Sequence, residues 1–297
     1  MDLNDLINDG WPRHDKQSAA LAADLEQHFA LANDGPKAVA FLALANHTIG
    51  FHLKDWPRAR KLAEAVVGGL DDSHAASPAF GSLAIAQFLA GDQAAALASE
   101  CRAVELTDAE PVAAMVRTRI LIASELVDAG QLEQGSRLYV AALNLARAQD
   151  EKLACDRAIA VTSNNLASNL LELASLTPEQ SALMLAAAEA AREFWLKAGN
   201  WENEERAEYL LALVNNKLGQ GQEARAHAAR GLQVIADNGE EVVDEAFLNL
   251  AAAKASLLLG DKGGYARSLG RADELAAGFS DQGLKDWFAT ERKKVVV

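Results

Sequence analysis

Histidines have the clearest potential for chemistry in this sequence, because a neutral imidazole can bind a metal ion or carry a proton. The chain contains six, namely His14, His28, His47, His52, His74 and His227. His47 and His52 are five residues apart, a spacing that places them on different faces of an α-helix, and no HExxH motif is present. We therefore predict no metal site and expect ordinary surface or groove histidines.

Two other patterns are compatible with an enzyme, but both have simpler explanations. Residues 219–224 (Gly-Gln-Gly-Gln-Glu-Ala) satisfy the dinucleotide-binding pattern GxGxxA, yet that motif follows a β-strand and residues 209–218 have helical periodicity. Glu202, Glu204 and Glu205 open a predicted helix, where acidic residues favour the positive end of the helix dipole. Since no Ser/His/Asp or Cys/His set can be assembled, we predict no catalytic residues, no cofactor and no enzymatic activity.

The charge balance argues against several kinds of partner. With 28 basic and 42 acidic residues the net charge is −14, which opposes binding to the phosphate backbone of nucleic acids. No apolar run approaches the roughly 20 residues needed to cross a bilayer, and the amino terminus does not resemble a signal peptide. Cys101 and Cys155 have no CxxC spacing and are expected to be buried thiols. We expect a cytoplasmic protein with no nucleic-acid or membrane partner.

The stretch 164–169 (Asn-Asn-Leu-Ala-Ser-Asn) contains the most informative polar residues. Asparagine is a poor helix former because its side chain competes for backbone hydrogen bonds, yet this stretch lies within a predicted helix. Asn165 and Asn169 are four residues apart and therefore share one helix face. They are candidates for ligand binding, and the alternative is a solvated or inter-helix polar contact.

Pairs of amphipathic helices must position these residues, and residues 120–149 are the clearest example. Apolar residues recur at helical spacing from Ile120 to Val127, the pattern breaks at Ala129–Gln131, and it resumes from Leu132 to Leu145. Gly130 suits the left-handed conformation that ends many helices. Because so short a pair cannot bury its apolar faces alone, it predicts neighbours of the same kind.

About six such pairs follow one another between residues 37 and 279, and the first begins with a helix over Lys37–Leu53. Adjacent turn glycines are 39 or 41 residues apart, which indicates a repeat of about forty residues. The four turn glycines are Gly91, Gly130, Gly219 and Gly260. Five of the six prolines stand at or near a predicted helix start, where the missing N–H does no harm.

The two ends of the chain differ from the repeats. Residues 1–14 are predicted to be a loose lead-in with a turn at Asn8–Gly10, and a helix over Lys16–Ala32 follows. A last helix over Gln282–Lys293 carries Leu284, Trp287 and Phe288 and is predicted to cap the array.

The repeated units resemble tetratricopeptide repeats (TPRs). The shared pattern is a large and a small residue within the first helix, glycine at the turn, and small residues in the second helix. It reads Leu83-Ala84, Gly91, Ala96 and Ala103 in one unit, and Leu211-Ala212, Gly219, Ala224 and Ala228 in another. The resemblance covers residues 37–279. Its period exceeds the usual thirty-four residues, as in the longer-helix variants of bacterial regulators and kinesin-light-chain-like scaffolds.

The resemblance implies an all-α fold, a right-handed α-solenoid of about six TPR-like hairpins with N- and C-terminal capping helices. Residues 1–36 would be the lead-in and capping helix, 37–279 the repeat superhelix, and 280–297 the capping helix and tail. First helices of TPRs line a concave groove that binds peptides. This implies the following groove candidates: Arg117, Ser124, Asn165, Asn169, Arg206, Tyr209, Asn216 and Lys254.

The implied function is a non-catalytic protein–protein interaction scaffold that binds a peptide or protein segment in the concave groove. Basic groups there favour an anionic ligand or a peptide carboxylate. The alternative is a ligand- or peptide-sensing domain of a bacterial regulatory system, although residues 1–35 are too short for a preceding helix-turn-helix. The identity of the partner stays open, as does pairing into a homodimer through the apolar patch Leu284–Phe288.

Overall fold

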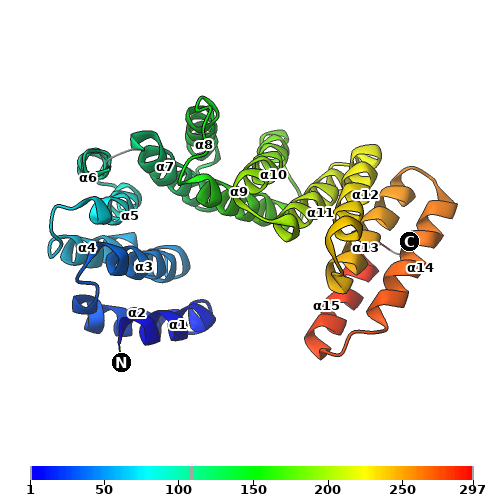
Figure 1. Ribbon diagram of the computed structural model, residues 1–297, viewed down its shortest axis with the longest axis horizontal. Coiled ribbons are helices and arrows are strands. Elements are labelled where there is room, and N and C mark those ends of the chain that lie inside the picture. Colours follow the sequence, from blue (N-terminus) through cyan, green and yellow to red (C-terminus); the bar gives the residue numbers. More distant parts are fainter. Residues whose placement is uncertain (1, 108–109, 296–297) are drawn as a thin grey trace. The chain divides into compact units, whose positions relative to one another are not determined.

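The computed structural model describes residues 2–107 and 110–295, where the chain forms fifteen α-helices and no strand (Figure 1). Residue 1 of the predicted lead-in and residues 296–297 of the predicted tail lie outside the described residues. The chain divides into two compact units, Met1–Cys155 and Asp156–Val297. This division falls inside the predicted repeat array, whereas the boundaries expected from the sequence stand at residues 36 and 279.

The helices of each unit follow the order of the chain. The first unit contains α1 (Leu3–Arg13), α2 (Ser18–His28), η1 (Phe29–Leu31), α3 (Gly35–Ala45), η2 (Asn46–His52), α4 (Trp56–Val67), η3 (His74–Ala76), α5 (Ser77–Leu89), α6 (Gln93–Leu106), α7 (Pro111–Asp128) and α8 (Leu132–Arg147). The second unit contains α9 (Asp156–Leu171), α10 (Pro178–Ala198), α11 (Trp201–Lys217), α12 (Gly221–Asn238), α13 (Val242–Leu258), α14 (Lys262–Ala276) and α15 (Gln282–Lys293).

Helical hairpins are the building blocks of both units. In the first unit α5 pairs with α6 and α7 with α8, while the first helices α3, α5 and α7 contact one another in succession. In the second unit α9 pairs with α10, α11 with α12 and α13 with α14, and the first helices α9, α11 and α13 again pack in succession. Each hairpin buries its apolar faces against its neighbours, which is the packing of an all-α solenoid.

The local signals for helix ends are confirmed. All four turn glycines have positive φ, at 91° for Gly91, 81° for Gly130, 74° for Gly219 and 70° for Gly260. A Cβ atom at these positions would meet nothing within 4 Å, so the preference for glycine comes from the backbone alone. Proline occupies the first turn of α3, α4, α5, α7 and α10. Thr177 and Gln180 form the capping box that starts α10.

The predicted loose lead-in is wrong, because residues 3–13 form α1. The backbone N–H of Asp5 donates to the Asp2 carboxylate, and that of Asp2 donates to the Asp5 carboxylate, which caps the helix. Leu6 is buried, and so is Gly10, where a Cβ atom would lie 2.5 Å from Leu44 Cδ2 of α3. Packing against α3 therefore outweighs the turn tendency of the sequence around Gly10.

Two further predictions concern the burial of the cysteines and the absence of membrane-spanning helices. Cys155 is buried as predicted, but Cys101 is exposed. Cys101 directly follows the buried Glu100 in α6, and one residue turns an α-helix by about 100°, so its side chain leaves the buried face. No helix in the part of the chain that the structure describes is long and apolar enough to cross a membrane.

Candidate functional site

A cavity of about 810 Å³ runs along α11 in the second unit, and a smaller cavity of about 100 Å³ adjoins it. Asn164 and Ser168 of α9 contribute to one wall of the larger cavity, and Trp287 and Glu291 of α15 contribute to another. Both cavities are lined by Tyr209 of α11, and we call them together the α11 groove. The larger volume lies within the range of roughly 300–1,000 Å³ that is typical of ligand sites.

Half of the groove candidates named from the sequence lie at this place. Arg206 and Tyr209 line the larger cavity, and Tyr209, Asn216 and Lys254 line the smaller one. These residues come together because α9, α11 and α13 pack side by side, with the second helices of the hairpins packed against them. Their participation in binding stays a prediction.

Arg206 is paired with acidic residues at the edge of the groove. Its Nε donates to Asp244 Oδ2 at 2.9 Å and lies 3.4 Å from Glu205 Oε1. Glu205 is 0% exposed, and burial together with the neighbouring Asp244 raises the pKa of its carboxyl to about 9. The helix-dipole explanation therefore suits Glu202 and Glu204 in the first turn of α11, but not Glu205, which is turned into the core.

Asn216 and Lys254 connect helices at the smaller end of the groove. Asn216 Nδ2 donates to the Ala251 carbonyl of α13 at 2.9 Å. Lys254 Nζ donates at 3.3 Å to the carbonyl of Lys294, which follows α15. These are inter-helix contacts, the alternative to ligand binding that the sequence left open. Both residues thus shape the groove, and a direct contact with a ligand stays a prediction.

Aromatic side chains supply apolar surface to the groove. Tyr209 meets Phe247 edge-on with ring centroids 6.4 Å apart, and Trp287 stacks on Phe247 at 4.1 Å. Trp287 is 50% exposed, so part of its ring is available to a ligand. Burial raises the pKa of Tyr209, which keeps its phenol neutral and able to donate a hydrogen bond. The sequence placed Trp287 in a cap and not in a groove, because the packing of α15 on α13 is a long-range contact.

Asn165 and Asn169 are not among the residues that line the α11 groove, whereas Asn164 and Ser168 are. Both pairs have the same four-residue spacing, but a shift of one residue turns the helix by about 100°. The two pairs therefore lie on different flanks of α9. The packing of α11 against α9 decides which flank borders the groove, and no local signal in the sequence distinguishes them.

Arg117 and Ser124 belong to α7 in the first unit. Arg117 lines a cavity of about 320 Å³ whose walls include Val39, Pro78 and Ala113, and burial lowers the pKa of its guanidinium. A cation in such surroundings favours an anionic ligand. Ser124 is only 8% exposed, on the buried side of α7, which leaves little of its hydroxyl for a ligand to contact.

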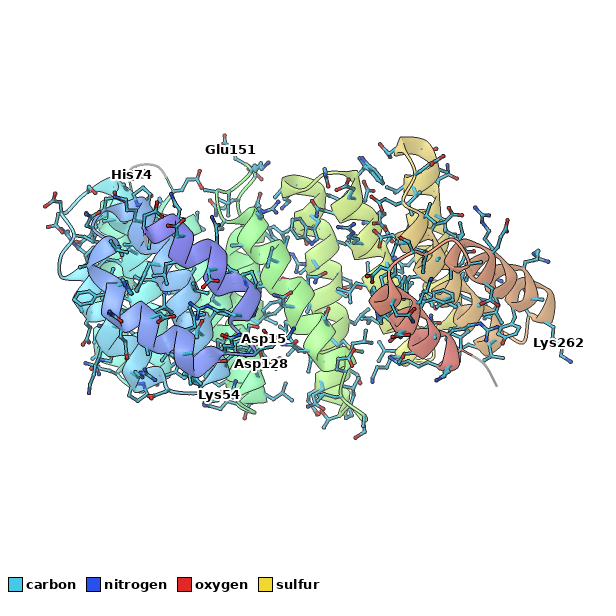
Figure 2. All side chains as sticks on the ribbon, turned by 90° about the horizontal axis from the view of Figure 1, so that it is seen from below. Asp15, Lys54, His74, Asp128, Glu151 and Lys262 are labelled. Carbon is cyan, nitrogen blue, oxygen red and sulfur yellow. The ribbon has the colours of Figure 1, made fainter. Side chains whose placement is uncertain are left out.

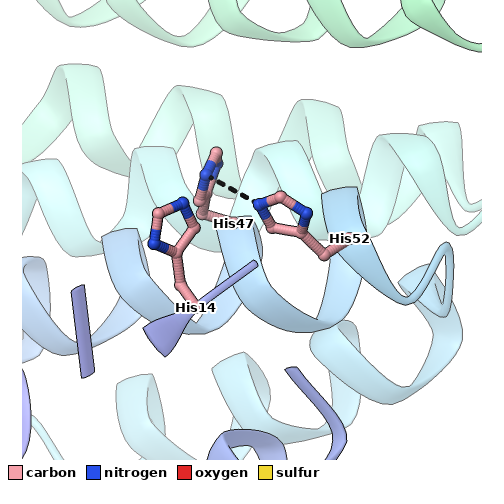
Figure 3. Close-up of side chains that lie close together, drawn as sticks. All are labelled: His14, His47 and His52. Atoms are coloured by element: carbon pink, nitrogen blue, oxygen red, sulfur yellow. Dashed lines mark hydrogen bonds between the residues drawn. The ribbon is translucent and has the colours of Figure 1, made fainter. Parts of the chain in front are cut away.

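The prediction that His47 and His52 lie on different faces is wrong. Residues Asn46–His52 form a π-helix, η2, in which backbone hydrogen bonds join residues five apart. A five-residue spacing therefore returns to the same side, and the Nε2 atoms of His47 and His52 are 3.2 Å apart (Figure 3). His14, directly after α1, completes the cluster, and one ring nitrogen from each of the three histidines lies within 4.8 Å of the others.

The surroundings of this histidine cluster lower the pKa of two of its rings, those of His47 and His52. The ring of His47 stacks on Phe51 at a centroid distance of 5.1 Å and lies 5.6 Å from that of Trp11. Burial and the neighbouring His52 and His14 lower the pKa of His47 to about 4. Burial and the neighbouring His14 also lower the pKa of His52. Asp15 and Lys54 lie at the same edge of the unit and add one charge of each sign (Figure 2).

Comparison with known proteins assigns no family to the chain. No family model and no curated protein sequence matches the chain. Among solved structures, the apo form of the quorum sensor NprR from B. thuringiensis matches with a TM-score of 0.36 and 16% sequence identity. The match covers 98% of this chain and 85% of that one. A TM-score this low assigns neither a family nor a site to the chain.

Proposed function

We propose that the protein is a non-catalytic scaffold that binds a peptide or protein segment in the α11 groove. The observation that carries this proposal is the convergence of side chains from α9, α11, α13 and α15 on one cavity of about 810 Å³. Peptide-binding grooves combine apolar surface for affinity with polar groups that orient the chain. Trp287 offers apolar surface, and the polar groups are those of Asn164, Ser168 and Tyr209.

The charge of the groove suggests the chemistry of the ligand. Its basic residues are Arg206, Lys217, Lys254 and Lys294, and its acidic residues are Glu172, Asp244 and Glu291. Basic groups thus slightly outnumber acidic ones here, although the whole chain has 28 basic against 42 acidic residues. Such a local excess favours a peptide with acidic side chains or a free carboxylate.

The contacts of the charged groups favour binding over catalysis. Lys217 Nζ donates to the carbonyls of Leu171 and Leu173 at 2.7 and 2.6 Å, so it stabilises the end of α9. Lys294 Nζ pairs with Glu291 at 2.7 Å. Charged groups that are held at helix ends and in ion pairs shape the groove. A general acid or base, in contrast, must be free to exchange a proton with the substrate.

A peptide-sensing domain is the second candidate function, and the position of α15 favours it. Trp287 and Glu291 of this helix line the groove, while Phe288 is its only buried residue. A ligand that needs the space beside Trp287 would shift α15, and the shift would report that the groove is occupied. The scaffold and the sensor therefore share one binding site and differ in what α15 does.

Selection of ligands from a library of short random peptides displayed on phage would test the proposal. Peptides selected on the full chain would then be measured by fluorescence anisotropy against Trp287→Ala and Lys254→Glu. Two matched controls lie outside the groove: Leu196→Ala removes an apolar side chain that is 49% exposed on α10, and Lys262→Glu reverses a charge at the start of α14 (Figure 2).

We expect each groove substitution to weaken binding about tenfold or more, the scale of an interface hot spot, and the controls to leave it unchanged. Selected peptides that bind all four variants equally, or a library that yields no binder, would overturn the proposal.

A further inference from the structure

We propose that His14, His47 and His52 form a binding site for a divalent transition-metal ion such as Zn²⁺. This site lies within the first unit and does not depend on the α11 groove. All three side chains are partly exposed, so an ion can reach them from solvent.

The distances between the donor atoms suit a single ion. The Nε2 atoms of His47 and His52 are 3.2 Å apart, and two imidazole nitrogens bound to one tetrahedral Zn²⁺ at about 2.0–2.1 Å are separated by about 3.3 Å. The donor atoms of all three histidines lie within 4.8 Å of one another (Figure 3). A side-chain movement of about 1.5 Å therefore completes a set of three ligands around one ion.

His14 already has the hydrogen bond that a metal ligand needs. Its Nδ1 donates to the carbonyl of Trp11, which leaves the lone pair on Nε2. In metal sites the second ring nitrogen of a ligating histidine commonly donates to such a carbonyl, which fixes the tautomer and the orientation of the ring. Metal binding through Nε2 requires the same tautomer in His47 and His52, with the proton of the neutral ring on Nδ1. A neutral ring that carries its proton on Nε2 shifts it to Nδ1, so binding releases no proton from it.

The backbone of η2 holds two of the ligands in place. Thr48, Ile49 and Gly50 between them are buried, so the π-helix is anchored in the core. A Cβ atom at Gly50 would lie 2.3 Å from Trp56 Cζ3, so the close approach of this ring requires glycine. The pairing of His47 with His52 thus follows from a packed backbone and does not depend on two free side chains meeting at the surface.

The donor set selects the class of ion. Three imidazoles and no carboxylate suit Zn²⁺, Cu²⁺, Ni²⁺ and Co²⁺, whereas Ca²⁺ and Mg²⁺ require oxygen ligands. With three protein ligands, a tetrahedral ion has one position left for water or another small ligand. Because His14 follows α1 and the other two belong to η2, the ion would link α1 to η2.

The test uses the full chain without a polyhistidine tag, stripped of metal with a chelator. Calorimetric titration with ZnCl₂ would be compared for the wild type, His47→Gln, His52→Gln and His28→Gln. His28 is the matched control, because its Nδ1 also contacts a backbone carbonyl, that of Asp24 at 2.8 Å, and it lies outside the cluster.

We expect one equivalent of Zn²⁺ to bind the wild type and His28→Gln with the same affinity. Loss of His47 or His52 should weaken binding by more than the roughly 10- to 100-fold that loss of an outer-shell partner causes. Hydrogen exchange provides a second measurement on the wild type alone: Zn²⁺ should slow exchange in α1 and leave α14 unchanged. Circular dichroism checks that each variant is folded.

The proposal is overturned if the wild type binds no stoichiometric Zn²⁺. It is equally overturned if both cluster variants retain the wild-type affinity, or if exchange in α1 does not respond to the ion.

Discussion

Glu205 and Glu208 show how two carboxyl groups one turn apart on α11 can act in opposite ways. Both are almost completely buried. Glu205 lies beside Asp244, and burial raises its pKa to about 9. Glu208 accepts hydrogen bonds from Arg192 and from His227 Nδ1, so its pKa is lowered although burial alone would raise it. Burial favours the neutral form of both carboxyls, and only Glu208 has cationic partners that outweigh it.

The pH dependence of stability follows from Glu205. In the folded protein this carboxyl keeps its proton up to about pH 9, while in the unfolded chain it loses the proton near 4.5. Its contribution to stability is thus complete below pH 4.5 and declines as the pH rises toward 9. We expect Glu205→Gln to increase the free energy of unfolding by about 1–3 kcal/mol at pH 8. Urea titrations should show no such gain near pH 4.5; an equal gain at both pH values would contradict the assignment.

The opposite sign is expected for Glu208→Gln. A lowered pKa means that the ionised carboxyl stabilises the fold above the ordinary value of 4.5, and that this contribution disappears as the pH falls through the folded pKa. The substitution should decrease the free energy of unfolding by about 1–3 kcal/mol at pH 7, because the hydrogen bonds of the buried carboxylate are lost. The same urea titrations measure it, with Glu205→Gln as the matched variant; a gain in stability at pH 7 would refute this role.

At the scale of elements, η2 is the segment that departs most from an ordinary helical hairpin. Its backbone turns more slowly than an α-helix, which brings residues five apart to one face. The chain leaves it through Lys54, the only non-glycine residue with positive φ in the part of the chain that the structure describes. The nitrogen of Asp55 then bonds to the Ile49 carbonyl at 3.0 Å, and the Asp55 side chain caps α4.

Gly50→Ala tests whether this element depends on the close approach of Trp56. The added methyl group would lie 2.3 Å from the indole, so ring or backbone must move. We expect a loss of about 1–3 kcal/mol in the free energy of unfolding, as for overpacked cores, together with weaker Zn²⁺ binding. Gly270→Ala in α14 is the control: nothing lies within 4 Å of the new atom, and the change should stabilise the helix by about 0.5–1 kcal/mol. Equal effects of the two substitutions on thermal unfolding would argue against a special role for Gly50.

At the scale of the whole molecule, each unit has a hydrophobic core of its own. Phe41, Leu42 and Leu44 are at the centre of one in the first unit. In the second unit Phe247, Phe279 and Phe288 pack together, the last of them from α15. A separate core is what permits a unit to fold independently.

Residues 156–297 alone should therefore fold. We expect this fragment to show a helical circular dichroism spectrum and one cooperative melting transition, because its hairpins and α15 complete a core. A shorter fragment, residues 156–238, lacks α13 and α15 and should melt at a lower temperature or not cooperatively. A fragment 156–297 without helical signal would show that its core depends on the first unit.

The sequence by itself determined the hairpins of this protein, through signals that act over a few residues. Apolar spacing, proline in the first turn and glycine after the last turn specify helices such as α7 and α8 independently of what lies around them. The resemblance to tetratricopeptide repeats, and not these local signals, predicted that α11 lines a groove, and Arg206, Tyr209 and Asn216 lie along its cavities.

Only the tertiary structure decided the rest, because it depends on contacts between residues distant in the chain. Packing of Gly10 against Leu44 converts an apparent turn into α1. The neighbour of α9 determines which asparagine borders the groove, and α15 reaches that groove only because it packs on α13. The π-helical turn of η2, which packs against α2, brings His47 beside His52, whereas the prediction from local periodicity assumes an α-helix.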